Sequence, residues 1–196
     1  MNTKKLAFAI MMGALGNVLF IISQGVGQIA QGISLDLSLI GVFIAAYYGG
    51  PLTGAITGLI AGIIPGIMYG PLGSNGVLGL IGLPVGKALT GLTTGLLVKG
   101  LKLPQITHQS LITAPTILLA YIPEGIFTYV YFSYLLPLFM GNVLSWAIIS
   151  TILLKATVEV VIMSVIMAAL VGNTGFKEFV KAHFTASKTT NCSEAH

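Results

Sequence analysis

Charged side chains are scarce in this sequence: they make up 7% of its 196 residues, whereas hydrophobic residues make up 55%. A soluble domain carries about 25% charged residues, so this chain cannot cover a water-facing surface. The composition therefore excludes a soluble globular enzyme and an intrinsically disordered chain. Because one membrane-spanning helix takes about 20 residues, the length accommodates about six such helices with short loops.

Arginine is absent, and the nine lysines are spread thinly among apolar segments, although the net charge is +4. Nucleic-acid binding requires clustered basic side chains on a polar face, so we expect no nucleic-acid partner. The one cysteine, Cys192, is in the polar C-terminal segment. A single cysteine excludes a disulfide framework and a thiolate metal cluster within the chain.

Six apolar segments follow one another along the chain and predict an all-α integral membrane protein with six transmembrane helices. They span residues 6–22, 35–48, 52–69, 77–98, 111–136 and 143–171. The second segment is the shortest, and we expect it to be tilted or partly re-entrant. We assign residues 1–175 to a single membrane domain and residues 176–196 to a polar, basic cytoplasmic tail.

The positions of the lysines test this count. Lysines occur before the first segment, in the connection 99–110 and in the tail, whereas the connections 23–34, 70–76 and 137–142 contain none. Cytoplasmic loops carry an excess of lysine and arginine. Six crossings place all three lysine-bearing regions on one side. We therefore predict that both termini are cytoplasmic in a multi-pass protein of the cell membrane.

Small residues recur at intervals of four, which places them on one face of a helix, where a neighbouring backbone can approach closely. The longest series is in the third segment, and shorter ones are in the fourth and the first: Gly54, Gly58, Gly62 and Gly66; Gly82 and Gly86; Gly91 and Gly95; Ala9 and Gly13. For the third and fourth segments we predict internal helix packing. For the first, the pair predicts a docking face for another membrane protein.

Four ionisable residues lie close to the midplane of the last three apolar segments: Lys87, Glu124, Lys155 and Glu159. Each costs roughly 2.5–3.5 kcal/mol at the centre of a membrane helix unless it is paired or functional. Lys155 and Glu159 are four residues apart and share a helix face. One interpretation is a neutral salt-bridge network that holds the three helices together. The other is a polar pocket for a solute, or a proton relay.

The fifth apolar segment favours the pocket, because polar and aromatic side chains share one of its faces by three-to-four-residue spacing. These are Tyr121, Glu124, Thr128 and Tyr131. The candidate substrate-binding residues are therefore Lys87, Tyr121, Glu124, Thr128, Lys155 and Glu159. Asp36, at the start of the second segment, resembles a helix N-cap, and Trp146 is interpreted as a membrane-interface residue.

Familiar catalytic motifs are missing from the sequence. Residues 82–88, GLPVGKA, superficially resemble a phosphate-binding loop, but Ile81 occupies the position of the first glycine and Ala88 that of the serine or threonine. Neither H-E-x-x-H nor G-x-S-x-G occurs, and the three histidines lie outside the apolar segments. We therefore expect no enzymatic activity, no bound metal and no cofactor in this chain.

Residues 35–63, LDLSLIGVFIAAYYGGPLTGAITGLIAGI, resemble the substrate-binding S components of energy-coupling factor (ECF) vitamin transporters. That family commonly shows a short second helix bearing Asp and Ser, then Gly-Pro, then a glycine-rich third helix. The chain also resembles the family in its length, in its six predicted helices and in its predicted cytoplasmic termini.

The resemblance implies high-affinity binding and translocation of a small vitamin-like micronutrient in a prokaryotic cell membrane. S components associate with a transmembrane T component and with cytoplasmic ATPase subunits, which supply the ATP-driven step. In the family, small residues on the first helix contact the T component, and Ala9 and Gly13 match that position. The family's pocket includes the loop after the first helix, which adds Gln28, together with Gln24 and Gln31, to the candidates.

Two other classes of function remain open. A self-sufficient proton-coupled secondary transporter or channel would use Glu124 or Glu159 as a proton carrier. Such transporters often contain an internal repeat, and the two halves of this chain show no convincing one. A purely structural membrane subunit would explain the glycines but not the cost of four charges near the midplane.

Overall fold

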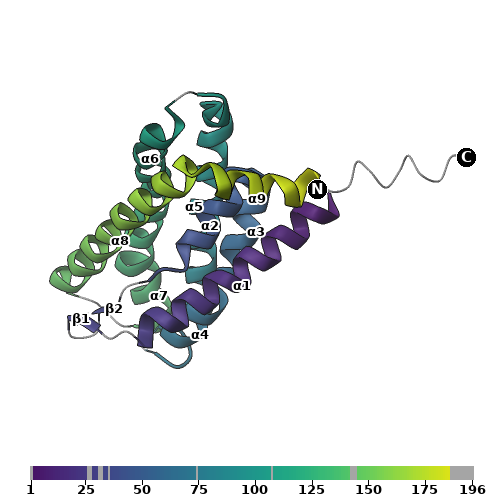
Figure 1. Ribbon diagram of the computed structural model, residues 1–196. Helices are drawn as coiled ribbons and strands as arrows, with labels where there is room; N and C mark the ends of the chain where they lie inside the picture. The colour runs from purple at the N-terminus through teal and green to yellow at the C-terminus, as the bar shows by residue number, and fades with distance from the viewer. Residues whose placement is uncertain are drawn as a thin grey trace, which may run out of the picture.

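The computed structural model describes residues 2–25, 28–30, 33–34, 36–73, 75–106, 108–141 and 145–185 (Figure 1). Nearly all of these residues are helical, and two very short strands pair antiparallel. The elements in chain order are α1 (Thr3–Gly25), β1 (Gln28–Ala30), β2 (Ile33–Ser34), α2 (Leu39–Gly49), α3 (Pro51–Ala61), α4 (Ile63–Tyr69), α5 (Gly76–Gly100), the 3-10 turn η1 (Leu103–Gln105), α6 (Gln109–Val130), the π-helical turn η2 (Tyr131–Leu135), α7 (Leu136–Met140), α8 (Trp146–Gly172) and α9 (Thr174–Thr185).

Five segments in the described part of the chain are long and apolar enough to cross a membrane, as expected of a multi-pass membrane protein. They are Thr3–Gly25, Pro51–Tyr69, Gly76–Gly100, Gln109–Met140 and Trp146–Gly172. The remaining predicted span, the second one at residues 35–48, corresponds to α2, which has only 11 residues. At 1.5 Å per residue it rises about 16 Å, roughly half of a hydrocarbon core of about 30 Å. Helix α2 is therefore too short to cross the membrane by itself.

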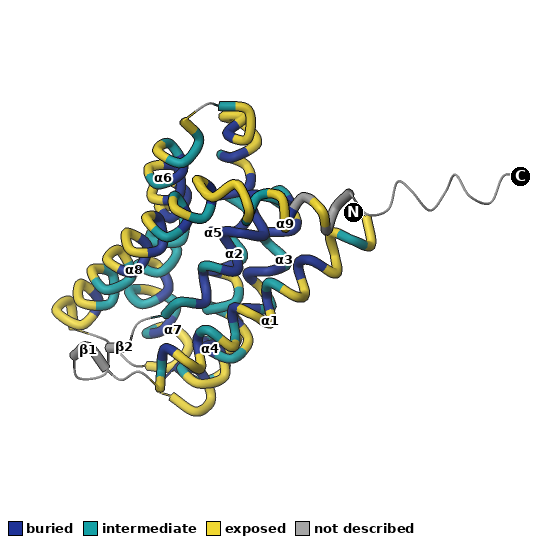
Figure 2. Tube along the Cα trace, in the orientation of Figure 1, coloured by how far each residue is buried: buried dark blue, intermediate teal, exposed yellow. Residues whose placement is uncertain are grey.

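The short helix α2 lies at the centre of the bundle and is buried along most of its length (Figure 2). It contacts α1, α3, α5 and α8. The turn after it is made by Gly50, whose φ of 93° is readily adopted only by glycine, and Pro51 then starts α3. Because α2 is short, the residues that precede it, Asp36 and Ser38, lie inside the bundle: the Ser38 side chain is fully buried.

Helices α3 and α5 pack backbone to backbone, which confirms the predicted internal role of Gly54, Gly58, Gly62 and Gly91. A Cβ atom added at Gly54 would lie 2.5 Å from the carbonyl oxygen of Gly91, and one added at Gly58 would collide with the backbone of Lys87. At Gly62 the added atom would collide with Pro84. The close approach of α3 therefore fixes the position of α5 along the stretch that carries Lys87.

The small residues of α1 are also used inside the fold, which differs from the sequence-based prediction. Ala9 is fully buried, and a Cβ atom added at Gly13 would lie 2.7 Å from the side chain of Ile60 on α3. The Thr57 hydroxyl of α3 donates a hydrogen bond to the Ala9 carbonyl at 3.2 Å. Because α3 already covers this face, Ala9 and Gly13 do not present an exposed docking face to a partner.

The boundary predicted at residue 176 falls within a helix. Helix α9 is amphipathic and packs back onto the bundle: Val180 is 3% exposed, and the Phe176 ring contacts Tyr48 of α2 edge-on at 6.1 Å. These two side chains, one aromatic and one aliphatic, hold the first part of the predicted polar tail against the helical bundle. Residues 186–196, including Cys192, lie outside the described part of the chain.

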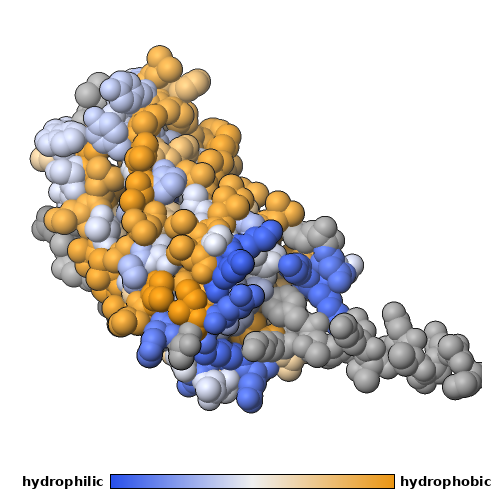
Figure 3. Space-filling view, turned by 90° about the horizontal axis from the view of Figure 1, so that it is seen from above, coloured by the Kyte–Doolittle hydropathy of each residue, from blue (hydrophilic) through white to orange (hydrophobic). Residues whose placement is uncertain are grey.

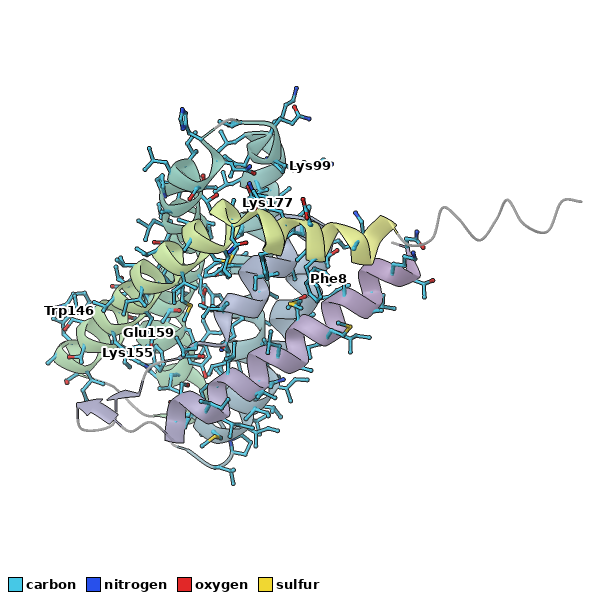
Figure 4. The ribbon with its side chains drawn as sticks, in the orientation of Figure 1. Phe8, Lys99, Trp146, Lys155, Glu159 and Lys177 are labelled. Carbon is cyan, nitrogen blue, oxygen red and sulfur yellow. The ribbon has the colours of Figure 1, made fainter. Side chains whose placement is uncertain are left out.

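The two ends of the bundle differ in character. The N-terminus and α9 lie on the same side of the molecule, away from the β1–β2 hairpin (Figure 1). Lys99 and Lys177 are on that side, whereas Trp146 is near the hairpin (Figure 4). Apolar side chains cover much of the face seen in Figure 3, and the hydrophilic ones gather in the lower part of the view. This distribution is the one expected of a bundle surrounded by lipid.

Candidate functional site

A cavity of about 660 Å³ lies between α5, α6, the turn η2 and α8, and reaches the segment before α2. Its volume is in the range of pockets that hold small organic ligands. Its charged and polar lining comprises Asp36, Asn75, Lys87, Glu124, Thr128, Thr151, Lys155 and Glu159, and its aromatic lining comprises Tyr69, Tyr121, Phe127, Tyr131 and Phe132. The structure thus brings six of the seven predicted substrate-binding residues to one cavity.

Lys87 is held at the inner wall of the cavity by the segment that precedes α2. Its side chain is 6% exposed, and its Nζ lies 2.7 Å from Asp36 Oδ2. Nζ also donates a hydrogen bond to Ser38 Oγ and lies 5.8 Å from the centre of the Phe20 ring of α1. The ammonium group is therefore paired and hydrogen-bonded, as a buried charge requires.

Asp36 is an ion-pair partner, and the prediction that it caps α2 is wrong. The residue that directly precedes the helix is Ser38, and its side chain forms no capping hydrogen bond. Asp36 Oδ1 instead accepts a hydrogen bond from the Ser38 N–H at 2.9 Å, which leaves Oδ2 free to bind Lys87. The carboxylate therefore stabilises a local turn and a cation on another helix at the same time.

Lys155 and Glu159 form the predicted pair on α8, with 3.4 Å between Nζ and Oε1. Both residues lie in the half of α8 nearer to Trp146 and the hairpin (Figure 4). Glu159 Oε1 also accepts a hydrogen bond from the Asp36 N–H at 2.6 Å. Through this bond α8 is tied to the same segment that holds Lys87.

Glu124 has a different environment from the other two carboxylates. It accepts a hydrogen bond from the Thr90 hydroxyl of α5, and none of the described residues forms an ion pair with it within 4.0 Å. The predicted neutral network of four residues is thus not formed, because Lys87 pairs with Asp36 rather than with Glu124. Three carboxylic acids and two lysines line the cavity.

The aromatic wall comes from α6 and η2. The ring centres of Phe127 and Tyr131 are 6.2 Å apart, and those of Tyr131 and Phe132 are 5.0 Å apart. The π-helical turn, in which the Leu136 N–H bonds to the Tyr131 carbonyl, brings the consecutive residues Tyr131 and Phe132 to the same cavity. Such turns often occur at functional sites. The buried hydroxyls of Tyr121 and Tyr131 have no hydrogen-bond partner among the described residues.

The remaining sequence-based candidates have separate outcomes. Gln28 lies in β1, but its side chain is outside the described part of the structure, as is the whole of Gln31. Gln24 donates a hydrogen bond to the hydroxyl of Tyr69, a cavity residue, at 2.9 Å. Trp146 is 66% exposed at the start of α8, which agrees with a membrane-interface position.

Several cavity residues were not among the sequence-based candidates. Phe127 lies one turn after Glu124 on the same helix and could have been found by the spacing that identified Thr128. Asp36 could not have been found from spacing, because its place in the cavity depends on the shortness of α2. Tyr69 and Phe132 depend on the ends of α4 and α6, which hydropathy does not define.

No protein-family model, curated protein or solved structure gives a significant match to this chain.

Proposed function

We propose that this chain is the substrate-binding membrane subunit of an ATP-driven importer of the energy-coupling factor type, and that its cavity binds a small vitamin-like solute. The observation that carries the proposal is the cavity itself: about 660 Å³, lined by five ionisable and five aromatic residues inside a bundle of apolar helices. A network that only locks helices together would be packed to the density of an ordinary protein interior. Space of this size beside buried charges favours a ligand.

The proposed topology has six helical segments, of which α2 is the short second one, and both termini in the cytoplasm. The lysines support this orientation, because Lys99 and Lys177 share one side with the N-terminus (Figure 4) and cytoplasmic loops carry excess lysine. Lys155 and Glu159 lie nearer to the opposite side, with Trp146 (Figure 4). The cavity would then face the outside, as an importer requires for capture of its solute.

In this proposal a transmembrane T component and cytoplasmic ATPase subunits provide the energy, and this chain provides specificity. The resemblance of residues 35–63 to S components supports that division of labour. The surface that meets the T component is not the pair Ala9 and Gly13, because α3 covers those residues.

One observation favours a second candidate, the proton-coupled secondary transporter: Glu124 lacks an ion partner among the described residues. A carboxylic acid that is neither paired nor fully solvated is suited to bind and release a proton. The two candidates predict different behaviour when the chain is reconstituted alone.

The test is native mass spectrometry of the gently purified chain, followed by uptake measurements in liposomes with the molecule that it retains. We expect a retained small molecule, and no net uptake by the chain alone. Uptake driven by a pH gradient without ATPase subunits would favour the secondary transporter. A chain that retains nothing, and that no micronutrient pool stabilises against heat, would contradict both candidates.

A further inference from the structure

The charges that face the cavity do not balance. Both cavity lysines are already in ion pairs, Lys87 with Asp36 at 2.7 Å and Lys155 with Glu159 at 3.4 Å. The third carboxylate of the lining belongs to Glu124. With all five groups ionised, one negative charge is left over, and it falls on that residue. An anionic ligand would find no unpaired cation in the described lining.

The position of Glu124 leaves part of its carboxylate open to the cavity. Oε2 accepts the hydrogen bond from Thr90, and Oε1 accepts none from the described residues. Gly86 of α5 lies near Oε1, and a Cβ atom added there would still be 3.5 Å from this oxygen. An ionised carboxylate can accept several hydrogen bonds, so the Glu124 carboxylate, which lines the cavity, has unused acceptor capacity.

Aromatic side chains line the same cavity as this carboxylate. Tyr121 and Phe127 lie within one turn of Glu124 on α6, and Tyr131 follows in η2. The faces of such rings attract cations and stack against other rings. The Tyr121 and Tyr131 side chains are 9% and 4% exposed, and their hydroxyls lack a partner among the described residues. Both residues line the cavity, so their rings can contact a bound ligand.

We propose that the cavity selects a small organic monocation with an aromatic ring, whose positive group binds Glu124 and whose ring lies among Tyr121, Phe127 and Tyr131. This inference rests on the proposed function and adds the chemical class of the solute. The carboxylate supplies the missing counter-ion, the aromatic wall accommodates both ring and charge, and the paired lysines disfavour an acidic solute. A ring with a short cationic side chain fits within about 660 Å³.

The test uses three probes that share an indole ring and differ in charge: tryptamine (cationic), tryptophol (neutral) and indole-3-acetate (anionic). Binding to the purified full chain is measured by thermal stabilisation and by titration, at the same pH and salt. We expect tryptamine to bind at least tenfold more tightly than tryptophol. Glu124→Gln should remove this advantage. Glu178→Gln, the same change on the exposed face of α9, is the matched control and should leave it unchanged.

A second variant protects the test against misfolding of the first. Phe127→Leu keeps the carboxylate and removes one ring, so it should weaken all three probes while preserving the order of their affinities. Tighter binding of tryptophol or indole-3-acetate, or equal tryptamine affinity in wild type and Glu124→Gln, would overturn the inference but not the proposed function. A molecule retained from the cell that carries no positive charge would also overturn it. Failure of every probe, with no retained molecule, would overturn both.

Discussion

Replacing Asp36 by Asn tests whether the segment before α2 holds the cavity together. The change removes the counter-ion of Lys87, whose side chain is only 6% exposed and whose Nζ lies 2.7 Å from Asp36 Oδ2. Ser38 Oγ is the other hydrogen-bond acceptor of this ammonium group, and a neutral hydroxyl cannot compensate its charge. Breaking a buried pair on one side typically costs 3–5 kcal/mol. We expect a loss of that size in the free energy of unfolding.

A double-mutant cycle separates the pair from its surroundings. Asp36→Asn and Lys87→Met are measured singly and together by denaturant unfolding of the ligand-free protein in detergent. The double variant should recover much of the lost free energy of unfolding, because it leaves no buried charge without a partner. Residues in contact typically show a coupling energy of 0.5–3 kcal/mol, and we expect a value in this range for Asp36 and Lys87. The pair of Lys155 and Glu159 is the comparison: Lys155 is 23% exposed and the distance is 3.4 Å, so its coupling should be smaller.

Two results would refute this reasoning. If the single changes at Asp36 and Lys87 are additive, the two side chains do not stabilise one another. If Asp36→Asn unfolds at the same denaturant concentration as wild type, the ammonium group is solvated and is not buried against the segment before α2.

Three further predictions concern packing, the cavity and topology. Gly58→Ala should lower the free energy of unfolding by about 1–3 kcal/mol through overpacking against the Lys87 backbone. Gly100→Ala is the control and should not lower it, because an added Cβ atom there meets nothing within 4 Å; equal effects would contradict the backbone contact. Gly86→Ala should leave solute binding unchanged, because its Cβ atom would lie 3.5 Å from Glu124 Oε1. Gly86→Leu should fill the cavity and weaken binding of the retained solute at least tenfold, about 1.4 kcal/mol; unchanged affinity would place the solute elsewhere. In a Cys192→Ser background, Leu72→Cys should react with an impermeant thiol reagent in intact cells and Leu101→Cys should not; the reverse pattern would invert the proposed orientation.

The apolar segments and the glycine series could be predicted from the sequence because they depend on local patterns. Five segments have the predicted membrane-spanning character, and Gly54 and Gly58 pack on α5 as their four-residue spacing indicates. The pattern of Ala9 and Gly13 is the same, but it does not specify which neighbour lies against it. The sequence therefore predicted that one face of α1 packs closely against a neighbour. It did not predict that this neighbour is α3.

The candidate cavity was predictable to the extent that its residues share helix faces. Glu124, Thr128 and Tyr121 follow helical spacing on α6, and the pair Lys155–Glu159 follows from an interval of four. The partner of Lys87 was not predictable in this way. It comes from a segment 51 residues earlier in the chain, and only the three-dimensional packing of α2 shows that this segment reaches the interior.

The shortness of α2 links the fold to the site. A helix that crossed the whole bilayer would place Asp36 at the membrane surface, where water would solvate its carboxylate. With 11 residues, α2 instead begins inside the bundle. The close contact of Gly58 with Lys87 holds α5 at the depth where the ammonium group meets that carboxylate. This pairing leaves Glu124 without an ion pair among the described residues. The excess negative charge of the cavity is thus a consequence of helix length, and lengthening the segment before α2 should both separate Asp36 from Lys87 and abolish the preference for a cationic solute.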